Sequence, residues 1–128
     1  MEMKTRSDSL HEMFYLREEF MNALNESSGI YPSWPLDVTK KESQQVLRES
    51  VLRGVEEIFE ALQELKNSKP HRKTEITQFN KSAFIEENVD ALNYFFTALI
   101  LVGVTPDDLL ESYKEKHKVI MKRLEDGY

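Results

Sequence analysis

Hydrophobic residues recur at helical intervals in four stretches of this chain, and no stretch of useful length shows the alternation that is typical of a β-strand. The first two stretches span residues 9–25 and 40–67, and the last two span residues 82–102 and 106–126. Helices with one apolar side bury that side against other elements. The pattern therefore predicts an all-α, four-helix fold, which we expect to form a single domain over residues 1–128.

The residues around these stretches carry signals that start and stop helices. Three pairs have the spacing of a capping box, namely Ser9 with Glu12, Thr39 with Glu42, and Thr105 with Asp108. Pro106 suits a first helical turn, and Gly103 suits the end of the preceding helix, because glycine adopts the left-handed conformation at little cost. Residues 26–37 hold one glycine and two prolines and are expected to form a loop, which carries the only tryptophan, Trp34.

The third predicted helix is the most apolar segment, yet one line of polar residues runs along it. At helical spacing this line consists of Glu86, Asp90, Asn93 and Thr97, with Glu87 beside it. A helix that is apolar on nearly every side is expected to be buried, and carboxylates near buried surface are costly unless a cation or hydrogen bonds compensate them. The segment therefore indicates that something positively charged binds there.

Two pairs of acids share the same spacing on consecutive helices. Glu57 and Glu60 are three residues apart, and so are Glu87 and Asp90. Residues at this spacing project from one side of a helix, so two antiparallel helices could direct all four carboxylates into one cleft. Hard oxygen ligands suit Mg²⁺. The alternative is a solvated acidic surface, because the chain holds 23 acids and the first pair lies opposite the main apolar stripe of its helix.

Composition narrows the classes of function. A net charge of -6 argues against a general binder of nucleic acid or anionic membranes, which needs clustered Lys and Arg. The chain has no cysteine, which excludes disulfides and thiolate metal sites. Its longest apolar run, residues 91–104, is interrupted by polar residues and is too short to span a bilayer. These features lead us to expect a soluble, cytoplasmic protein.

The acidic pattern EExxE, followed by a basic loop and ExxD, resembles the all-α nucleoside triphosphate pyrophosphatases. That superfamily includes MazG, the dimeric dUTPases and related phage dCTPase/dUTPase enzymes. The C-terminus is similar to the dimeric dUTPase pattern at Tyr113, Lys116, Arg123, Gly127 and Tyr128, whereas the two asparagines of that pattern are His117 and Ile120 here. In the first helix Leu24 and Asn25 match an LN motif whose leading glutamine is Met21. These departures put uracil specificity in doubt.

The resemblance implies a four-helix MazG-like or dimeric-dUTPase-like bundle that is completed by homodimerisation. It implies cleavage of a nucleoside triphosphate, most simply dUTP or dCTP, between the α and β phosphates. Mg²⁺ would be held by Glu57, Glu60, Glu87 and Asp90, and one glutamate of the first pair, with Glu60 preferred over Glu57, would orient the attacking water. The implied substrate-binding residues are Asn25, Trp34, His71, Arg72, Asn93, Lys116, Arg123 and Tyr128.

Ordinary structural roles compete with several of these assignments. Lys116 and Arg123 are seven residues apart and share one side of a helix, but Arg123 could simply complement the helix dipole in the last turn. His71 could be an ordinary loop histidine, and Trp34 could be buried in the core or an interface. Two other functions also remain open: a MazG-like housecleaning pyrophosphatase of broader or purine specificity, and a non-catalytic helical adaptor.

Overall fold

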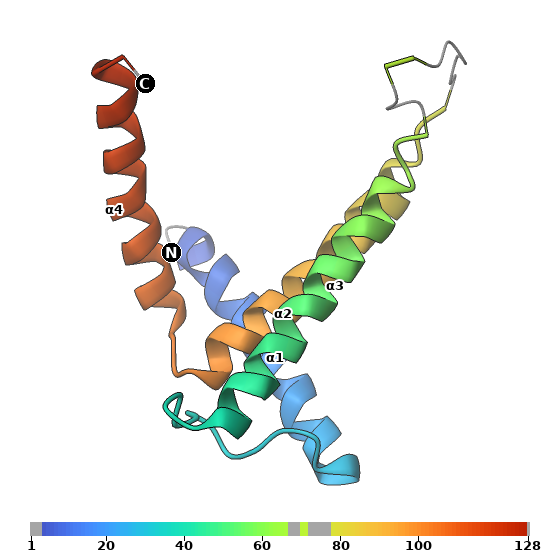
Figure 1. The fold of residues 1–128 in the computed structure, drawn as a ribbon, viewed down its shortest axis with the longest axis vertical. Helices are drawn as coiled ribbons and strands as arrows, with labels where there is room; N and C mark the ends of the chain where they lie inside the picture. The colour runs from blue at the N-terminus through green and yellow to red at the C-terminus, as the bar shows by residue number, and fades with distance from the viewer. Residues whose placement is uncertain (1–3, 67–69, 72–77, 128) are drawn as a thin grey trace. The chain divides into compact units, whose positions relative to one another are not determined.

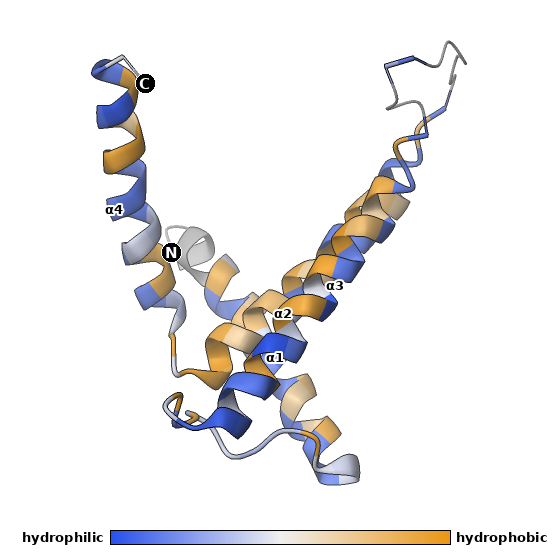
Figure 2. Ribbon diagram, in the orientation of Figure 1, coloured by the Kyte–Doolittle hydropathy of each residue, from blue (hydrophilic) through white to orange (hydrophobic). Residues whose placement is uncertain are grey.

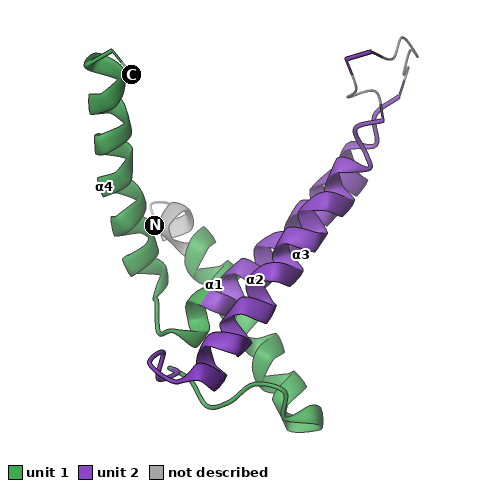
Figure 3. Ribbon diagram, in the orientation of Figure 1, with its two compact units in different colours: residues 1–35, 99–128 green, residues 36–98 purple. Residues whose placement is uncertain are grey.

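The computed structural model describes residues 4–66, 70–71 and 78–127, and it describes side chains from residue 9 onward within them. This part of the chain contains four α-helices and no strand, so the predicted all-α class is confirmed (Figure 1). The helices are α1 (Lys4–Ser28), α2 (Lys41–Leu62), α3 (Lys81–Leu101) and α4 (Pro106–Glu125). They belong to two compact units, which Figure 3 distinguishes: unit 1 is Met1–Pro35 with Leu99–Tyr128, and unit 2 is Leu36–Ala98.

The starts of the first two helices differ from the prediction. Because α1 begins at Lys4, Ser9 lies inside the helix and does not cap it. The N-cap of α2 is Lys40, whose side chain makes no capping hydrogen bond. Thr39 instead donates to Asp37 Oδ1 through its hydroxyl at 2.6 Å and its backbone N–H at 3.1 Å, which lowers the pKa of Asp37. Two of the three predicted capping boxes are therefore wrong: α1 begins upstream of Ser9, and Thr39 bonds to Asp37 instead.

Helix α2 ends at Leu62, earlier than predicted. The backbone N–H groups of Gln63 and Leu65 donate to the carbonyls three residues earlier, at Glu60 and Leu62, and both distances are 3.0 Å. Such bonds tighten the chain into 3₁₀-type turns rather than continuing an α-helix. The predicted end at Asn67 lies outside the described residues.

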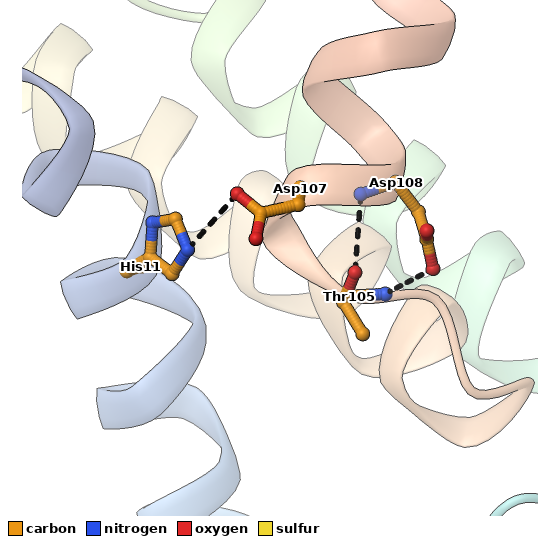
Figure 4. Close-up of polar contacts among 4 residues, drawn as sticks. All are labelled: His11, Thr105, Asp107 and Asp108. Atoms are coloured by element: carbon orange, nitrogen blue, oxygen red, sulfur yellow. Dashed lines mark hydrogen bonds and ion pairs between the residues drawn. The ribbon is translucent and has the colours of Figure 1, made fainter.

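The turn into α4 follows the sequence signals. Asp108 N–H donates to Thr105 Oγ1 at 3.1 Å, and Thr105 N–H donates to Asp108 Oδ2 at 3.0 Å, so this capping box is confirmed (Figure 4). Gly103 has a positive φ of 84°. Val104 N–H donates to Leu99 C=O at 3.0 Å and Gly103 N–H to Ile100 C=O at 3.0 Å, which is the Schellman arrangement that satisfies carbonyls at the end of α3.

In unit 1, α1 contacts α4 near the start of α4. His11 Nε2 and Asp107 Oδ1 are 3.2 Å apart across this contact (Figure 4). Phe14 and Met21 are buried along one side of α1, as the helical spacing of apolar residues predicts. Helix α4 has no buried residue, so this contact leaves its hydrophobic side chains accessible.

In unit 2, α2 and α3 form an antiparallel helical hairpin. The residues of α2 that are buried are small, namely Ser43, Ser50, Gly54 and Ala61. Ser50 Oγ donates to Tyr94 C=O at 2.9 Å, and Gly54 lies against the ring of Phe95. Small side chains let the two helix backbones approach closely, so the side of α2 that packs on α3 is not its main hydrophobic side.

Most large hydrophobic side chains of α2 remain exposed, from Ile58 at 37% to Phe59 at 61%, whereas Val46 and Leu47 are half-buried. The first half of α3 also exposes apolar residues, including Ile85, although the sequence predicted burial on nearly every side. Figure 2 shows hydrophobic positions along α2, α3 and α4. Among the described helices none is individually long and apolar enough to cross a membrane, and only α3 with α4, as a bent pair, meets that test of length and composition.

Candidate metal centre

Three carboxylates meet where the last turns of α2 lie beside the first turns of α3. Glu57, Glu87 and Asp90 each present a carboxylate oxygen, and these three oxygens all lie within 4.8 Å of one another. All three residues are half-buried. Oxygen atoms at this spacing from two adjacent helices could hold a metal ion, and carboxylates are ligands for hard divalent cations such as Mg²⁺.

The positions follow from local helix geometry. Gly54 and Ala61 mark the side of α2 that faces α3, and Glu57 lies between them along that side. On α3, Glu87 and Asp90 are about one turn apart, and both lie on the same side of the buried Ala91. The sequence placed Glu57 opposite the main apolar stripe of its helix, but small residues rather than that stripe form the side of α2 that packs on α3. Glu57 therefore lies on the packing side.

Glu60 lies at the edge of the same cluster. It is exposed and is not one of the three residues whose oxygens converge, but it forms a side-chain hydrogen bond with Glu57. This bond, with desolvation and repulsion from Glu60, Asp90 and Glu87, raises the pKa of Glu57. A raised pKa means that Glu57 keeps its proton to a higher pH than an ordinary glutamate does.

The pKa of Glu87 is also raised, first by desolvation and then by the charges of Glu60 and Asp90. Glu60 contributes a hydrogen bond to this shift as well, and Glu86 adds a smaller repulsion. The pKa values of Glu57 and Glu87 are thus raised in part by the charges of other predicted ligands. The four predicted ligands are therefore electrostatic neighbours. Concentrated negative charge of this kind favours a proton or a cation.

Glu86 and Thr97, two further residues of the polar line on α3, are explained without a ligand. Glu86 is exposed, whereas Thr97 is fully buried. Thr97 Oγ1 donates to Asn93 C=O at 3.0 Å, so the buried hydroxyl is satisfied within its own helix. Asn93 is half-buried, and its predicted contact with substrate stays a prediction.

Two predicted substrate-binding residues brace the loop after α1 in unit 1. Asn25 Nδ2 donates to Tyr31 C=O at 2.9 Å, and Asn25 Oδ1 accepts from Tyr31 N–H at 2.8 Å. Trp34 Nε1 donates to Glu18 Oε2 at 2.8 Å. Both side chains therefore have a structural role in unit 1.

The predicted cationic residues have different locations. Lys116 and Arg123 are exposed on α4, in unit 1, and His71 is exposed in a turn of unit 2. Arg72 and Tyr128 lie outside the described residues, so the structure bears on neither prediction. The structure thus brings together Glu57, Glu87 and Asp90 in unit 2. The phosphate contacts proposed for Lys116 and Arg123 remain predictions.

A pocket in unit 1 was not anticipated from the sequence. Its volume is about 320 Å³, and its lining includes His11, Phe14, Glu18 and Trp34 together with the turn between α3 and α4. His11, Phe14 and Glu18 have the helical spacing of one side of α1, which is the signal that could have identified this wall. The other wall comes from residues far away in sequence, which spacing cannot reveal.

Searches of protein-family models, curated proteins and solved structures found no match to this chain. The candidate centre is therefore interpreted from its own geometry.

Proposed function

We propose that this protein is a Mg²⁺-dependent nucleoside triphosphate pyrophosphohydrolase. One observation carries the proposal: carboxylate oxygens of Glu57, Glu87 and Asp90 converge within 4.8 Å from two helices. The acidic pattern that resembles the all-α nucleoside triphosphate pyrophosphatases supplies the reaction class. In this proposal the substrate is dUTP or dCTP, and the products are the monophosphate and pyrophosphate.

Each acid has a distinct role in the proposal. Glu57, Glu87 and Asp90 hold the ion, and when bound Mg²⁺ supplies charge neutralisation at the phosphate oxygens. Glu60, at the exposed edge, orients the attacking water and accepts its proton. The position of Glu60 supports this role, because it lies at the exposed edge of the cluster and interacts with Glu57.

The remaining parts of the proposal rest on the sequence. Lys116 and Arg123 steady the phosphates, and Asn93 contacts the nucleoside. Asn25 and Trp34 already have hydrogen-bonding partners in unit 1, so a direct contact with substrate would have to displace or share those bonds. The protein acts as a cytoplasmic homodimer.

The test compares Asp90→Asn and Glu87→Gln with Glu56→Gln, a matched control at an exposed acid of α2. Pyrophosphate release is measured with Mg²⁺ across a panel of dNTPs and NTPs. We expect both site variants to lose about 100-fold or more in turnover, since each removes a metal ligand, and the control to resemble the wild type. Wild-type turnover in both site variants would overturn the assignment.

The same panel separates the other functions. Similar turnover of many triphosphates, or a preference for purines, would indicate the MazG-like housecleaning activity instead. The exposed hydrophobic residues of α2 favour a non-catalytic adaptor as the second candidate, because such surfaces bind protein partners. The adaptor predicts no turnover of any triphosphate and no heat when Mg²⁺ and a nonhydrolysable triphosphate are added in a calorimeter.

A further inference from the structure

The pocket beside α1 is formed by unit 1 alone. Its volume is about 320 Å³, and every residue that lines it belongs to that unit. One wall is the side of α1 that carries Phe14, Tyr15 and Glu18, and the other wall includes Val104 in the turn between α3 and α4. A pocket of this volume can hold a small organic molecule.

Trp34, the third aromatic residue of the pocket, is held in place from two sides. Its Nε1 donates to Glu18 Oε2 at 2.8 Å, which ties the indole to α1. The next residue, Pro35, lies against the other wall, because a β-carbon added at Gly103 would be 3.2 Å from Cβ of Pro35. The indole therefore lines a pocket that is formed before any ligand binds.

The pocket carries a negative charge at Glu18. This side chain is half-buried, and among the described residues its only hydrogen bond is the one from Trp34 to Oε2, so Oε1 can accept another. Of the described residues that line the pocket, only His11 can carry a positive charge. His11 Nε2 lies 3.2 Å from Asp107 Oδ1, so Asp107 matches that charge when His11 is protonated (Figure 4). A half-buried carboxylate without a counter-charge favours a cationic ligand.

We infer that this pocket binds a small aromatic amine in its protonated form. The ammonium group donates to Glu18 Oε1, and a charge-assisted hydrogen bond of this kind is stronger than a neutral one. The aromatic body contacts Phe14, Tyr15 and Trp34, and aromatic rings attract both other rings and nearby cations.

The ligand differs in charge from the triphosphate of the proposed function. Phosphate groups would be repelled by Glu18, whereas an ammonium group is attracted to it. The inference therefore goes beyond the proposed function and does not rest on it. Its tests contain neither Mg²⁺ nor nucleotide, so the two proposals succeed or fail separately.

Fluorescence titration at pH 7 tests the choice of ligand, because Trp34 is the only tryptophan. Benzylamine is protonated at this pH, and benzyl alcohol is a neutral control of similar shape. We expect a saturable change in emission with benzylammonium, and a dissociation constant about tenfold lower than that of benzyl alcohol. Equal affinities for the two compounds would overturn the inference.

Glu18→Gln tests whether the carboxylate selects the cation. Glutamine retains an acceptor oxygen for Trp34 and removes the charge, so we expect the preference for benzylammonium over benzyl alcohol to disappear. Glu19→Gln makes the same change of charge at an exposed neighbour that does not line this pocket, and it should retain the preference. A folded Glu18→Gln variant with wild-type preference, or an equal loss in Glu19→Gln, would contradict the proposed contact.

Thermal unfolding of the wild type covers the case in which Glu18→Gln fails to fold. A ligand that binds only the folded chain raises the unfolding temperature, so benzylammonium should raise it more than benzyl alcohol at the same concentration. No rise in the unfolding temperature and no saturable change in emission would together overturn the inference.

Tyr15→Leu tests the aromatic part of the inference. Tyr15 is exposed, so its replacement should leave the fold intact, and we expect benzylammonium to bind about threefold more weakly without the ring. Leu16→Ala, at an exposed neighbour outside the pocket, is the control. The wild type is also titrated with n-butylammonium, which resembles a lysine side chain, by following the unfolding temperature and the Trp34 emission. Weaker binding than that of benzylammonium supports an aromatic ligand, whereas tighter binding would overturn it in favour of a lysine side chain.

Discussion

A β-carbon added at Gly54 would lie 2.6 Å from Cε1 of Phe95, closer than carbon atoms approach in folded proteins. Cζ and Cδ1 of the same ring would lie at 2.9 and 3.0 Å. The contact therefore involves one whole edge of the phenyl ring. It sets how closely α2 and α3 approach in the hairpin that carries the carboxylates.

Gly54→Ala is expected to destabilise the protein even though alanine favours helices. The intrinsic gain is about 1 kcal/mol, and overpacking against Phe95 costs about 1–3 kcal/mol. The net loss should be about 1 kcal/mol, measured by urea unfolding. Phe95→Leu in the Gly54→Ala background should recover part of this loss by making room. A stability gain in the single Gly54→Ala variant would show that the Phe95 ring can move aside at little cost.

Much of the fold could be predicted because the strongest signals are local. The capping box of Thr105 and Asp108 and the left-handed Gly103 depend on neighbours in sequence, and all three behave as predicted. Ser9 and Thr39 have the same local signals, but α1 begins upstream of Ser9 and Asp37 competes for Thr39. A capping pattern shows that a capping hydrogen bond is possible. It does not show whether the side chain will bond to another partner instead.

Thr105→Ala is expected to lower stability by about 1 kcal/mol, because it leaves the Asp108 N–H without its capping acceptor. Thermal unfolding followed by circular dichroism measures the loss. Thr105→Ser retains the hydroxyl and is the matched control, so it should remain close to the wild type. An equal loss in both variants would assign the effect to the methyl group rather than to the cap.

Glu57→Gln is expected to stabilise the protein at pH 7 and to have little effect at pH 4. The pKa of Glu57 in the folded chain is raised above its ordinary 4.5, so the folded state holds this proton more tightly than the unfolded state. Stability is therefore lost as pH rises from 4.5 through the raised pKa, and glutamine removes that loss. Urea unfolding at both pH values measures the difference.

The control for this comparison is Glu56→Gln, which changes the same charge at an exposed neighbour. It should show a smaller gain at pH 7. Mg²⁺ should stabilise the wild type more than Glu57→Gln if the cluster binds the ion, because binding to the folded state alone raises stability by mass action. Equal pH profiles for the two variants would show that Glu57 is not under particular repulsion.

The candidate site was harder to predict than the fold. Spacing alone identified Glu57, Glu87 and Asp90, because a separation of three residues places side chains on one side of a helix. Spacing could not show which side of α2 faces α3, since the large hydrophobic residues of α2 suggested that their own side packs on α3. Ser50 and Gly54 face α3 because their small size allows the two helix backbones to approach closely. A pattern of large hydrophobic residues does not identify such positions.

Glu18→Ala is expected to destabilise unit 1 and to change the fluorescence of Trp34, the only tryptophan of the chain. Trp34 Nε1 donates to Glu18 Oε2 at 2.8 Å, and both side chains are half-buried. Removing the acceptor leaves a partly buried indole N–H without its partner, at a cost of about 1–3 kcal/mol. Glu18→Gln keeps an acceptor oxygen and should lose less, and Glu19→Ala at an exposed neighbour controls for helix propensity. Unchanged emission in Glu18→Ala would show that this bond does not hold the indole in place.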